Sequence, residues 1–356
     1  MPHCGEPLLL ISLLCLTLVW GQRMQSGSLK RREFIALIAG TAAAWPLAAR
    51  AQQPERVRRI GVLMGFADAP SQSYVTAFRG ALTKLGWAEG SNLRTEVRWG
   101  DGDAEKIRSF AKELVELRPD AIVAQSTPVV AALARETQTI PIVFVNVADP
   151  IGSGFVVGLA RPGGNLTGFM TDNSALGGKW VQLLKEIAPR TVRVALMFNP
   201  TTAVPLKFYL PSIQAAASTS GIEVNATPVH AKDEIEGVIA AQARDQGSSL
   251  IVTPDAFNGA NREEITLLAA RYRVPAMYYR REFAEAGGLI AYASDFAEQF
   301  PQAAAYVDRI LKGAKPADLP VQAPTKFDLV INLKTAKALG LDVTLGMQQR
   351  ADELIE

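Results

Sequence analysis

The sequence predicts an α/β fold with two Rossmann-like lobes, built from duplicated βαβ units and joined by a three-strand hinge. Short apolar runs rich in β-branched residues alternate with amphipathic helical patterns along residues 57–290, a pattern typical of parallel sheets covered by helices. Landmarks also repeat at a nearly fixed offset, 135 positions from Gly86 to Gly221 and 134 from Pro141 to Pro275. A repeated order of elements indicates a duplicated lobe.

The first lobe is predicted from alternating strand and helix patterns that begin after a basic stub. Pro128 in the first turn favours a helix start, with Thr127 expected as the N-cap. Apolar runs bounded by turn residues mark the strands. The expected strands are 57–64, 93–99, 120–124 and 142–147, and the expected helices are 73–85, 104–117 and one that begins at Thr127.

The second lobe is predicted from the same order of patterns, beginning at Val192. Its expected strands are 192–198, 222–227, 250–255 and 274–279, and its expected helices are 206–218, 233–245 and 261–272. Glycine-rich or extended passages at 161–170, 286–295 and 320–333, with helices at 297–311 and 334–339, would join the lobes. We expect lobe 1 to comprise 57–168 plus 293–322, and lobe 2 to comprise 171–290 plus 324–350.

The segment before the lobes has the composition of a targeting signal. Arg31-Arg32 precede an apolar run at 34–45, and Ala49-Arg50-Ala51 is a small-x-small cleavage site. This pattern resembles a twin-arginine signal peptide over residues 24–51, cleaved after Ala51. We therefore expect a soluble, exported, periplasmic protein.

A second apolar run, Leu8 to Trp20, has no basic residue in its N-terminal flank. We interpret residues 1–23 as a start-site artefact, and a genuine extra membrane segment is the alternative.

Charge and cysteine content exclude several classes of function. Residues 1–51 hold five of the 37 basic and two of the 35 acidic side chains, so the remainder carries 32 and 33 and is nearly neutral. That balance argues against nucleic-acid binding. Both cysteines, Cys4 and Cys15, lie in the expected signal region, which excludes disulfides and thiol chemistry from the mature chain. We expect no metal, no cofactor and a monomer.

Enzyme signatures are also missing. The chain has no G-x-S-x-G elbow and no G-x-x-x-x-G-K-[ST] phosphate loop, and Gly61 to Gly65 does not continue as G-x-G-x-x-G. The expected mature chain has one histidine, His230, which we place near an exposed strand end. We therefore predict that the protein is not an enzyme.

Polar residues follow several of the predicted strands, where ligands bind in open α/β sheets. Free N–H groups at a helix start favour a carboxylate, and Ser126 and Thr127 would add hydroxyl groups. Asp149, Asp172, Asp255 or Asp295 would accept hydrogen bonds from an ammonium group. The alternative for each residue is simple N-capping or turn formation. Most aromatic side chains are expected in the core, with one or two lining the cleft: Tyr209, Phe257, Tyr278, Tyr279 and Tyr292.

Several motifs together resemble the tryptophan/tyrosine-type family of ABC-transporter substrate-binding proteins. They are Arg31-Arg-Glu-Phe, Ile60-Gly-Val-Leu, Pro141-Ile-Val-Phe with Asp149-Pro150, Gly163-Gly-Asn-Leu-Thr-Gly168, Leu183-Leu-Lys-Glu-Ile with Pro189, Gly313-Ala-Lys-Pro-Ala-Asp-Leu-Pro320 and Asn332-Leu-Lys-Thr-Ala336. The resemblance implies a type I periplasmic binding protein fold, whose lobes close on a small ligand. With the strand-end pattern, it gives these candidate ligand-binding residues: Ser126, Thr127, Asn146, Asp149, Thr171, Asp172, Asn199, Asp255, Tyr292 and Asp295.

The function expected from these observations is an exported receptor for a small zwitterionic or anionic solute, with an aromatic amino acid as one candidate. Its partner would be an ABC permease in the inner membrane. The first alternative is a sensor subunit that presents the solute to a membrane signalling receptor. The second is an exported enzyme on the same fold.

Overall fold

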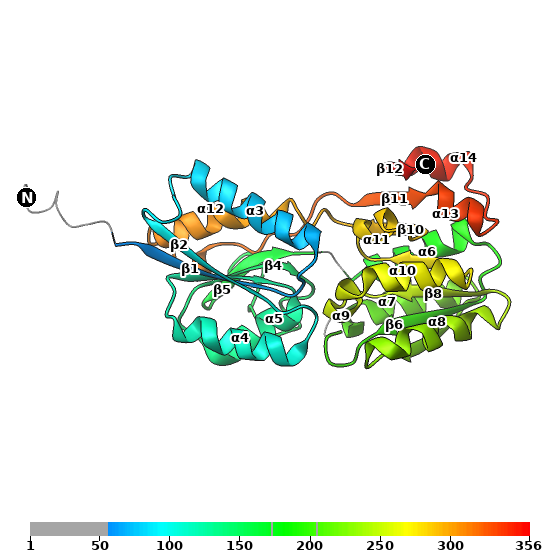
Figure 1. The fold of residues 1–356 in the computed structure, drawn as a ribbon, viewed down its shortest axis with the longest axis horizontal. Helices are drawn as coiled ribbons and strands as arrows, with labels where there is room; N and C mark the ends of the chain where they lie inside the picture. The colour runs from blue at the N-terminus through cyan, green and yellow to red at the C-terminus, as the bar shows by residue number, and fades with distance from the viewer. Residues whose placement is uncertain (1–55, 172–173, 204–205) are drawn as a thin grey trace, which may run out of the picture. The chain divides into compact units, whose positions relative to one another are not determined.

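The computed structural model describes residues 56–171, 174–203 and 206–356 (Figure 1). Residues 57–356 form a compact unit of their own. The expected signal peptide, the upstream apolar run and Asp172 lie outside the described residues. Within the described part of the chain, no helix is both long and apolar enough to cross a bilayer.

The first lobe is built on a five-stranded parallel sheet in the order β2-β1-β3-β4-β5. In Figure 1, α3 and α12 lie on one side of this sheet and α4 and α5 on the other. The helix α12 comes from the C-terminal part of the chain and packs on α3 and β4. The bounds are β1 Arg58–Met64, α3 Ala69–Lys84, β2 Leu93–Trp99, α4 Ala104–Glu116, β3 Ala121–Gln125, α5 Thr127–Glu136, β4 Ile142–Val147, β5 Leu166–Met170 and α12 Gln299–Leu311.

The second lobe repeats this strand order and extends it. Its seven-stranded sheet runs β12-β11-β10-β9-β8-β6-β7, so its first five strands again follow the order second, first, third, fourth, fifth. Only β11 runs antiparallel to its neighbour β10. The bounds are α6 Leu176–Ile187, β6 Arg193–Phe198, α7 Leu206–Thr219, β7 Glu223–Pro228, η1 Lys232–Glu234, α8 Ile235–Ala243, β8 Ser248–Val252, α9 Ala256–Ala260, α10 Arg262–Arg271, β9 Ala276–Tyr278, α11 Arg281–Glu285, β10 Ile290–Ala293, β11 Asp328–Asn332, α13 Leu333–Ala338, α14 Leu345–Arg350 and β12 Glu353–Ile355. The predicted α/β class and lobe duplication are confirmed.

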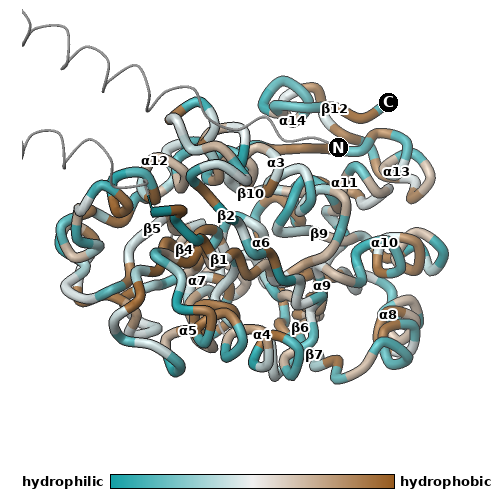
Figure 2. The backbone as a smooth tube through the Cα atoms, turned by 60° about the vertical axis from the view of Figure 1, so that its left-hand side comes forward, coloured by the Kyte–Doolittle hydropathy of each residue, from teal (hydrophilic) through white to brown (hydrophobic). Residues whose placement is uncertain are grey.

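The cores of both lobes lie between their sheets and the covering helices. Every residue of β3, β4, β5 and β8 is buried, as expected for strands covered on both faces. Figure 2 shows hydrophobic residues near β1 and β4 and also along several helices. At the edge of lobe 2, the fully buried Trp180 packs on Tyr209, with ring centroids 5.0 Å apart. Its indole N–H donates to the Tyr292 carbonyl at 2.9 Å.

Three passages connect the lobes, as the hinge prediction requires. They run from β5 to α6, from β10 to α12, and from η2 (Pro316–Asp318) to β11. Two hydrogen-bonded contacts tie them together. Phe169 and Gln322 form an isolated parallel bridge, and the Ser294 hydroxyl donates to the Thr171 carbonyl at 2.5 Å.

Two predicted helix starts are wrong. The helix α3 begins four residues earlier than expected, because the Asp68 carboxylate accepts from the Ser71 N–H at 3.1 Å and caps it. The N-cap of α5 is Ser126 rather than Thr127, and it has a positive φ of 85°. Five of the α-helices and strands in the described residues were not predicted at all: α6, α9, α11, α14 and β12.

Candidate ligand-binding site

A pocket lies between the two lobes, at the carboxyl ends of the strands of both sheets. Its cavity volume is about 30 Å³, so any ligand larger than a few water molecules needs the two walls to move apart. Topology explains its position, since parallel strands end at one edge of each sheet and the two edges face each other. The lining residues are Phe66, Ser126, Thr127, Pro128, Asn146, Ala148, Thr171, Thr202, Pro254, Asp255, Ala256, Tyr279 and Phe296.

The lobe 1 wall of the pocket holds buried polar atoms that make no hydrogen bond to any described residue. They are the Ser126 hydroxyl, both amide atoms of Asn146 and the Thr171 hydroxyl. A buried polar atom without a partner costs about 1–3 kcal/mol. Ser126 and Asn146 also have positive φ values of 85° and 55°, which non-glycine residues rarely adopt. Such a concentration of unsatisfied atoms and backbone strain marks a binding surface.

The start of α5 supplies the anion-binding part of this wall. Ser126 is the N-cap, but its side chain does not cap the helix, so its hydroxyl is free to contact a ligand. The Thr127 hydroxyl accepts from the Ala148 N–H at 3.2 Å and thereby joins the ends of β3 and β4. The first N–H groups of a helix have no partners within the helix and favour a negative charge. The arrangement suits a carboxylate.

The lobe 2 wall holds a buried carboxylate, Asp255. It accepts from the Asn199 N–H at 2.5 Å and the Phe257 N–H at 2.8 Å, and also from the Thr202 hydroxyl. Burial raises the pKa of Asp255 to about 6, although these hydrogen bonds act in the opposite direction. The carboxylate is thus charged at neutral pH, in surroundings that would favour a cationic partner.

Aromatic side chains close the remaining sides of the pocket. Phe66 follows β1, Tyr279 follows β9 and Phe296 follows β10. The Tyr279 hydroxyl donates to the Asp255 carbonyl at 2.9 Å. Tyr279 was one of the aromatic residues expected in the core or cleft, whereas Phe66 and Phe296 were missed. Both residues come shortly after a predicted strand, so the reasoning that selected the polar candidates would also have found them.

The structure brings five of the ten candidate residues to this pocket: Ser126, Thr127, Asn146, Thr171 and Asp255. Asn199 lies beside it, and its side chain instead bonds the His230 carbonyl and Thr201. Asp149 lies in a turn with φ 44°, where it accepts from the Gly152 N–H at 2.7 Å. Asn199 and Asp149 therefore shape loops that border the pocket.

Tyr292 and Asp295 are not placed with the other candidates. Tyr292 stacks on Phe327 at a centroid distance of 5.8 Å, in a separate groove against α6 and α7. Asp295 accepts from the Ala297 N–H and lines another hollow at the lobe connections. Tyr292 lies within β10 and Asp295 follows it, but neither side chain lines the pocket. Among the described residues, no group of three or more histidine or acidic side chains is arranged to hold a metal ion.

Comparison with known proteins agrees with this architecture. A model of the family described as ABC transporter substrate binding protein matches residues 60–355. A tyrosine-binding protein of Clostridioides difficile is 25% identical over 261 residues, which cover 73% of this chain and 74% of that protein. These relatives are solute-binding proteins and not enzymes.

Two solved structures are similar over 84% of this chain. A conserved domain protein of Vibrio cholerae has a TM-score of 0.77 and 26% identity, with all of its chain covered. An ABC domain of Streptococcus pneumonia in complex with L-Trp has a TM-score of 0.76 and 25% identity, with 99% of its chain covered.

Proposed function

Because this chain belongs to the ABC transporter substrate-binding protein family, we propose that it is an exported receptor for a zwitterionic amino acid with an aromatic side chain. The receptor binds this solute between its lobes and delivers it to an ABC permease in the inner membrane. Like its relatives, the protein is a solute-binding protein and not an enzyme.

One observation carries the choice of ligand class. The lobe 1 wall offers unpaired hydrogen-bonding groups at a helix start, and the lobe 2 wall offers the buried Asp255 carboxylate. A carboxylate on the first wall and an ammonium group on the second would satisfy both. Aromatic rings between the walls suit an aromatic side chain. The tyrosine and L-Trp named for two relatives support the same class.

Export is supported by the sequence before the lobes. Paired arginines, an apolar run and a small-x-small site end at Ala51, directly before the folded unit that begins at Val57. We propose a periplasmic protein released from its signal by cleavage after Ala51. It acts as a monomer and does not bind nucleic acid, consistent with the near-neutral charge of residues 52–356.

Identification of the bound solute tests the proposal. The full chain is expressed in a bacterium that exports it, purified without denaturation, and analysed by native mass spectrometry. We expect a bound mass equal to that of tyrosine, tryptophan or a close relative, which denaturation releases. A sugar or polyol of similar mass would contradict the proposed ligand class, and fragmentation of the released compound distinguishes the two.

A further inference from the structure

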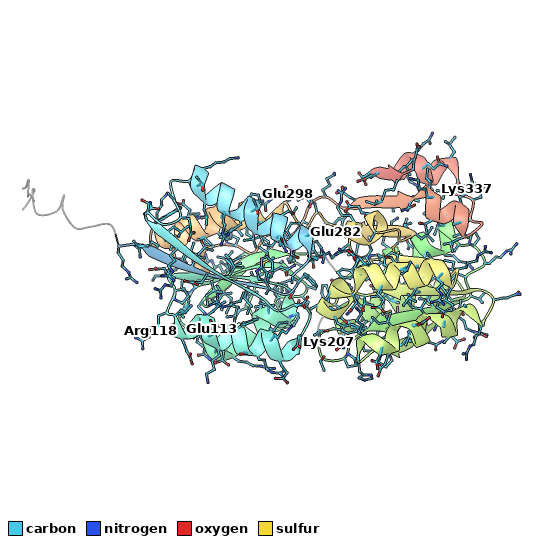
Figure 3. All side chains as sticks on the ribbon, viewed as in Figure 1. Glu113, Arg118, Lys207, Glu282, Glu298 and Lys337 are labelled. Carbon is cyan, nitrogen blue, oxygen red and sulfur yellow. The ribbon has the colours of Figure 1, made fainter. Side chains whose placement is uncertain are left out.

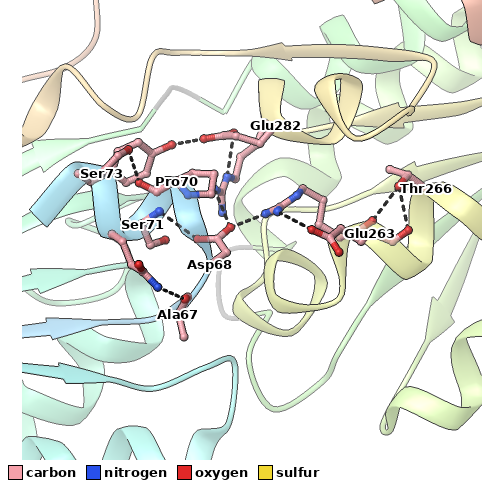
Figure 4. Close-up of polar contacts among 12 residues, drawn as sticks. Ala67, Asp68, Pro70, Ser71, Ser73, Glu263, Thr266 and Glu282 are labelled. Atoms are coloured by element: carbon pink, nitrogen blue, oxygen red, sulfur yellow. Dashed lines mark hydrogen bonds and ion pairs between the residues drawn. The ribbon is translucent and has the colours of Figure 1, made fainter. Parts of the chain in front are cut away.

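A cluster of charged residues joins the two lobes beside the pocket (Figure 4). Asp68 and Tyr74 belong to lobe 1, whereas Arg262, Arg280 and Glu282 belong to lobe 2. Asp68 forms an ion pair with Arg262 and lies 3.6 Å from Nη2 of Arg280. The Tyr74 hydroxyl donates to Glu282, which Figure 3 labels where the lobes meet. Because they join the two lobes, these contacts are lost when the lobes separate.

Arg280 lies at the centre of this cluster and is fully buried. Its Nε donates to Glu282 Oε2 at 3.2 Å, while neither Nη atom has a hydrogen-bond partner among the described residues. The guanidinium lies over the rings of Phe66 and Phe296, 4.8 Å and 5.6 Å from their centroids. Stacking on aromatic faces is a favourable environment for a buried arginine.

The charge of the cluster is balanced across the lobes. Burial would raise the pKa of Glu282, but the neighbouring Arg280 lowers it to about 2. Glu282 is therefore ionised and compensates one of the two arginines. Asp68 compensates the other, and it is contributed by the opposite lobe. When the lobes separate, both arginines lose Asp68. Arg280 then keeps Glu282, and Arg262 keeps only the exposed Glu263, 3.6 Å away in lobe 2.

We propose that Arg280 is a positioning residue that couples lobe closure to the aromatic wall of the ligand pocket. Its two ring partners both line the pocket, one from lobe 1 and one from the connection after β10. In the closed state Arg280 holds Phe66 and Phe296 in place, and Asp68 holds Arg280 against lobe 1. Opening removes Asp68 and Phe66 from Arg280, so release of a ligand requires this cluster to break. The inference rests on the proposed function of the pocket.

Asp68→Asn tests the coupling with little change to lobe 1. Asparagine caps helices as well as aspartate, so α3 keeps its N-cap while Arg262 and Arg280 lose the negative charge that lobe 1 contributes. Asp103→Asn is the matched control, since Asp103 caps α4 in the same lobe and is exposed. With L-tryptophan and L-tyrosine as probes, stopped-flow fluorescence measures association and release separately.

We expect Asp68→Asn to accelerate release about tenfold or more, because it removes the carboxylate that lobe 1 contributes to two buried arginines. Association should be unchanged, since the cluster forms after the ligand has entered. Asp103→Asn should leave both rates unchanged. Arg280→Gln should accelerate release further, while Arg281→Gln should not, because Arg281 pairs with Glu285 and Glu353 within lobe 2. Equal release rates for Asp68→Asn and Asp103→Asn would overturn the inference.

A ligand-independent measurement separates this inference from the proposed function. Cys4 and Cys15 are replaced by serine in the full chain, and spin labels are attached at Ala77→Cys and Ala270→Cys, both exposed and in different lobes. If wild-type protein binds neither amino acid, the proposed function fails. The coupling still requires Asp68→Asn and Arg280→Gln to lengthen the label distance relative to Asp103→Asn. An unchanged distance would contradict it.

Discussion

The buried charge of Asp255 lowers the stability of the folded protein at neutral pH, but it offers a partner to a cationic group of the ligand. Burial raises the pKa of Asp255 in the folded protein from the usual aspartate value of 3.8 to about 6. The folded state thus favours the protonated acid more than the unfolded chain does. The stabilisation linked to Asp255 is fully present below about pH 4 and is lost as the pH rises through about 6. At neutral pH the folded protein therefore retains a buried charge at an energetic cost, which a cationic ligand group would offset.

The affinity for an amino acid should fall as the pH falls below about 6. Protonation of Asp255 removes the charge that an ammonium group needs, so we expect the dissociation constant for L-tryptophan to rise about tenfold per pH unit there. Fluorescence titration between pH 5 and pH 8 measures this change. The Asp255→Asn variant should bind weakly with little pH dependence, and Asp149→Asn, altered outside the pocket, should follow wild type. A flat wild-type profile would exclude Asp255 as the ammonium partner.

Individual site residues were predictable where strand ends fix them. Ser126 and Asp255 follow buried apolar strands and Asn146 lies near the carboxyl end of one, so their position at the sheet edge follows from the sequence pattern. Side-chain direction was not predictable in the same way. Tyr292 lies near the end of a strand and Asp295 follows it, but their side chains lie in other hollows.

The short helix α9 is one of the elements of lobe 2 that contact lobe 1. Asp255 caps it, and Gly259 within it lies against Phe66 of the opposite lobe. A Cβ atom at Gly259 would lie 2.3 Å from the Phe66 ring. Phe66 cannot easily move aside, because it is 3% exposed and lies beneath Arg280. Glycine at this position therefore permits the closed state.

Gly259→Ala should weaken ligand binding without destabilising the ligand-free protein. Alanine favours a helix over glycine by about 1 kcal/mol, while its methyl group obstructs the approach of Phe66. We expect an unchanged or higher melting temperature and a dissociation constant raised about tenfold or more, from the cost of overpacking. Gly80→Ala in α3 is the control, since a Cβ there meets no atom within 4 Å. Equal affinities of the two variants would contradict a tight lobe contact at α9.

Most strands and long helices could be predicted from the sequence, because buried parallel strands and amphipathic helices have clear periodicity. The five elements that were missed have weaker signals. Four of them, α9, α11, α14 and β12, are only three to six residues long, too short for a period to show. The helix α6 is twelve residues long but contains Gly177 and Gly178, which usually mark turns. These glycines instead allow α7 to pack closely, with backbone of Tyr209 and Ser212 within reach.

At the scale of the whole folded unit, the duplication explains why a pocket exists. Two sheets with the same strand order present equivalent edges, and the three lobe connections hold those edges opposite each other. The sequence predicted this arrangement from repeated landmarks. It did not predict the charged cluster, because Asp68, Arg262 and Glu282 come from distant segments whose meeting depends on how far the lobes close.

Calorimetric titration with matched ligands tests the central claim most directly. L-tryptophan and L-tyrosine carry both charged groups, whereas tryptamine lacks the carboxylate and indole-3-propionate lacks the ammonium group. We expect the amino acids to bind, and each analogue to bind about tenfold more weakly or worse, because it leaves one wall of the pocket without its partner. Binding of tryptamine or indole-3-propionate as tight as that of L-tryptophan, or no binding of either amino acid, would contradict the account.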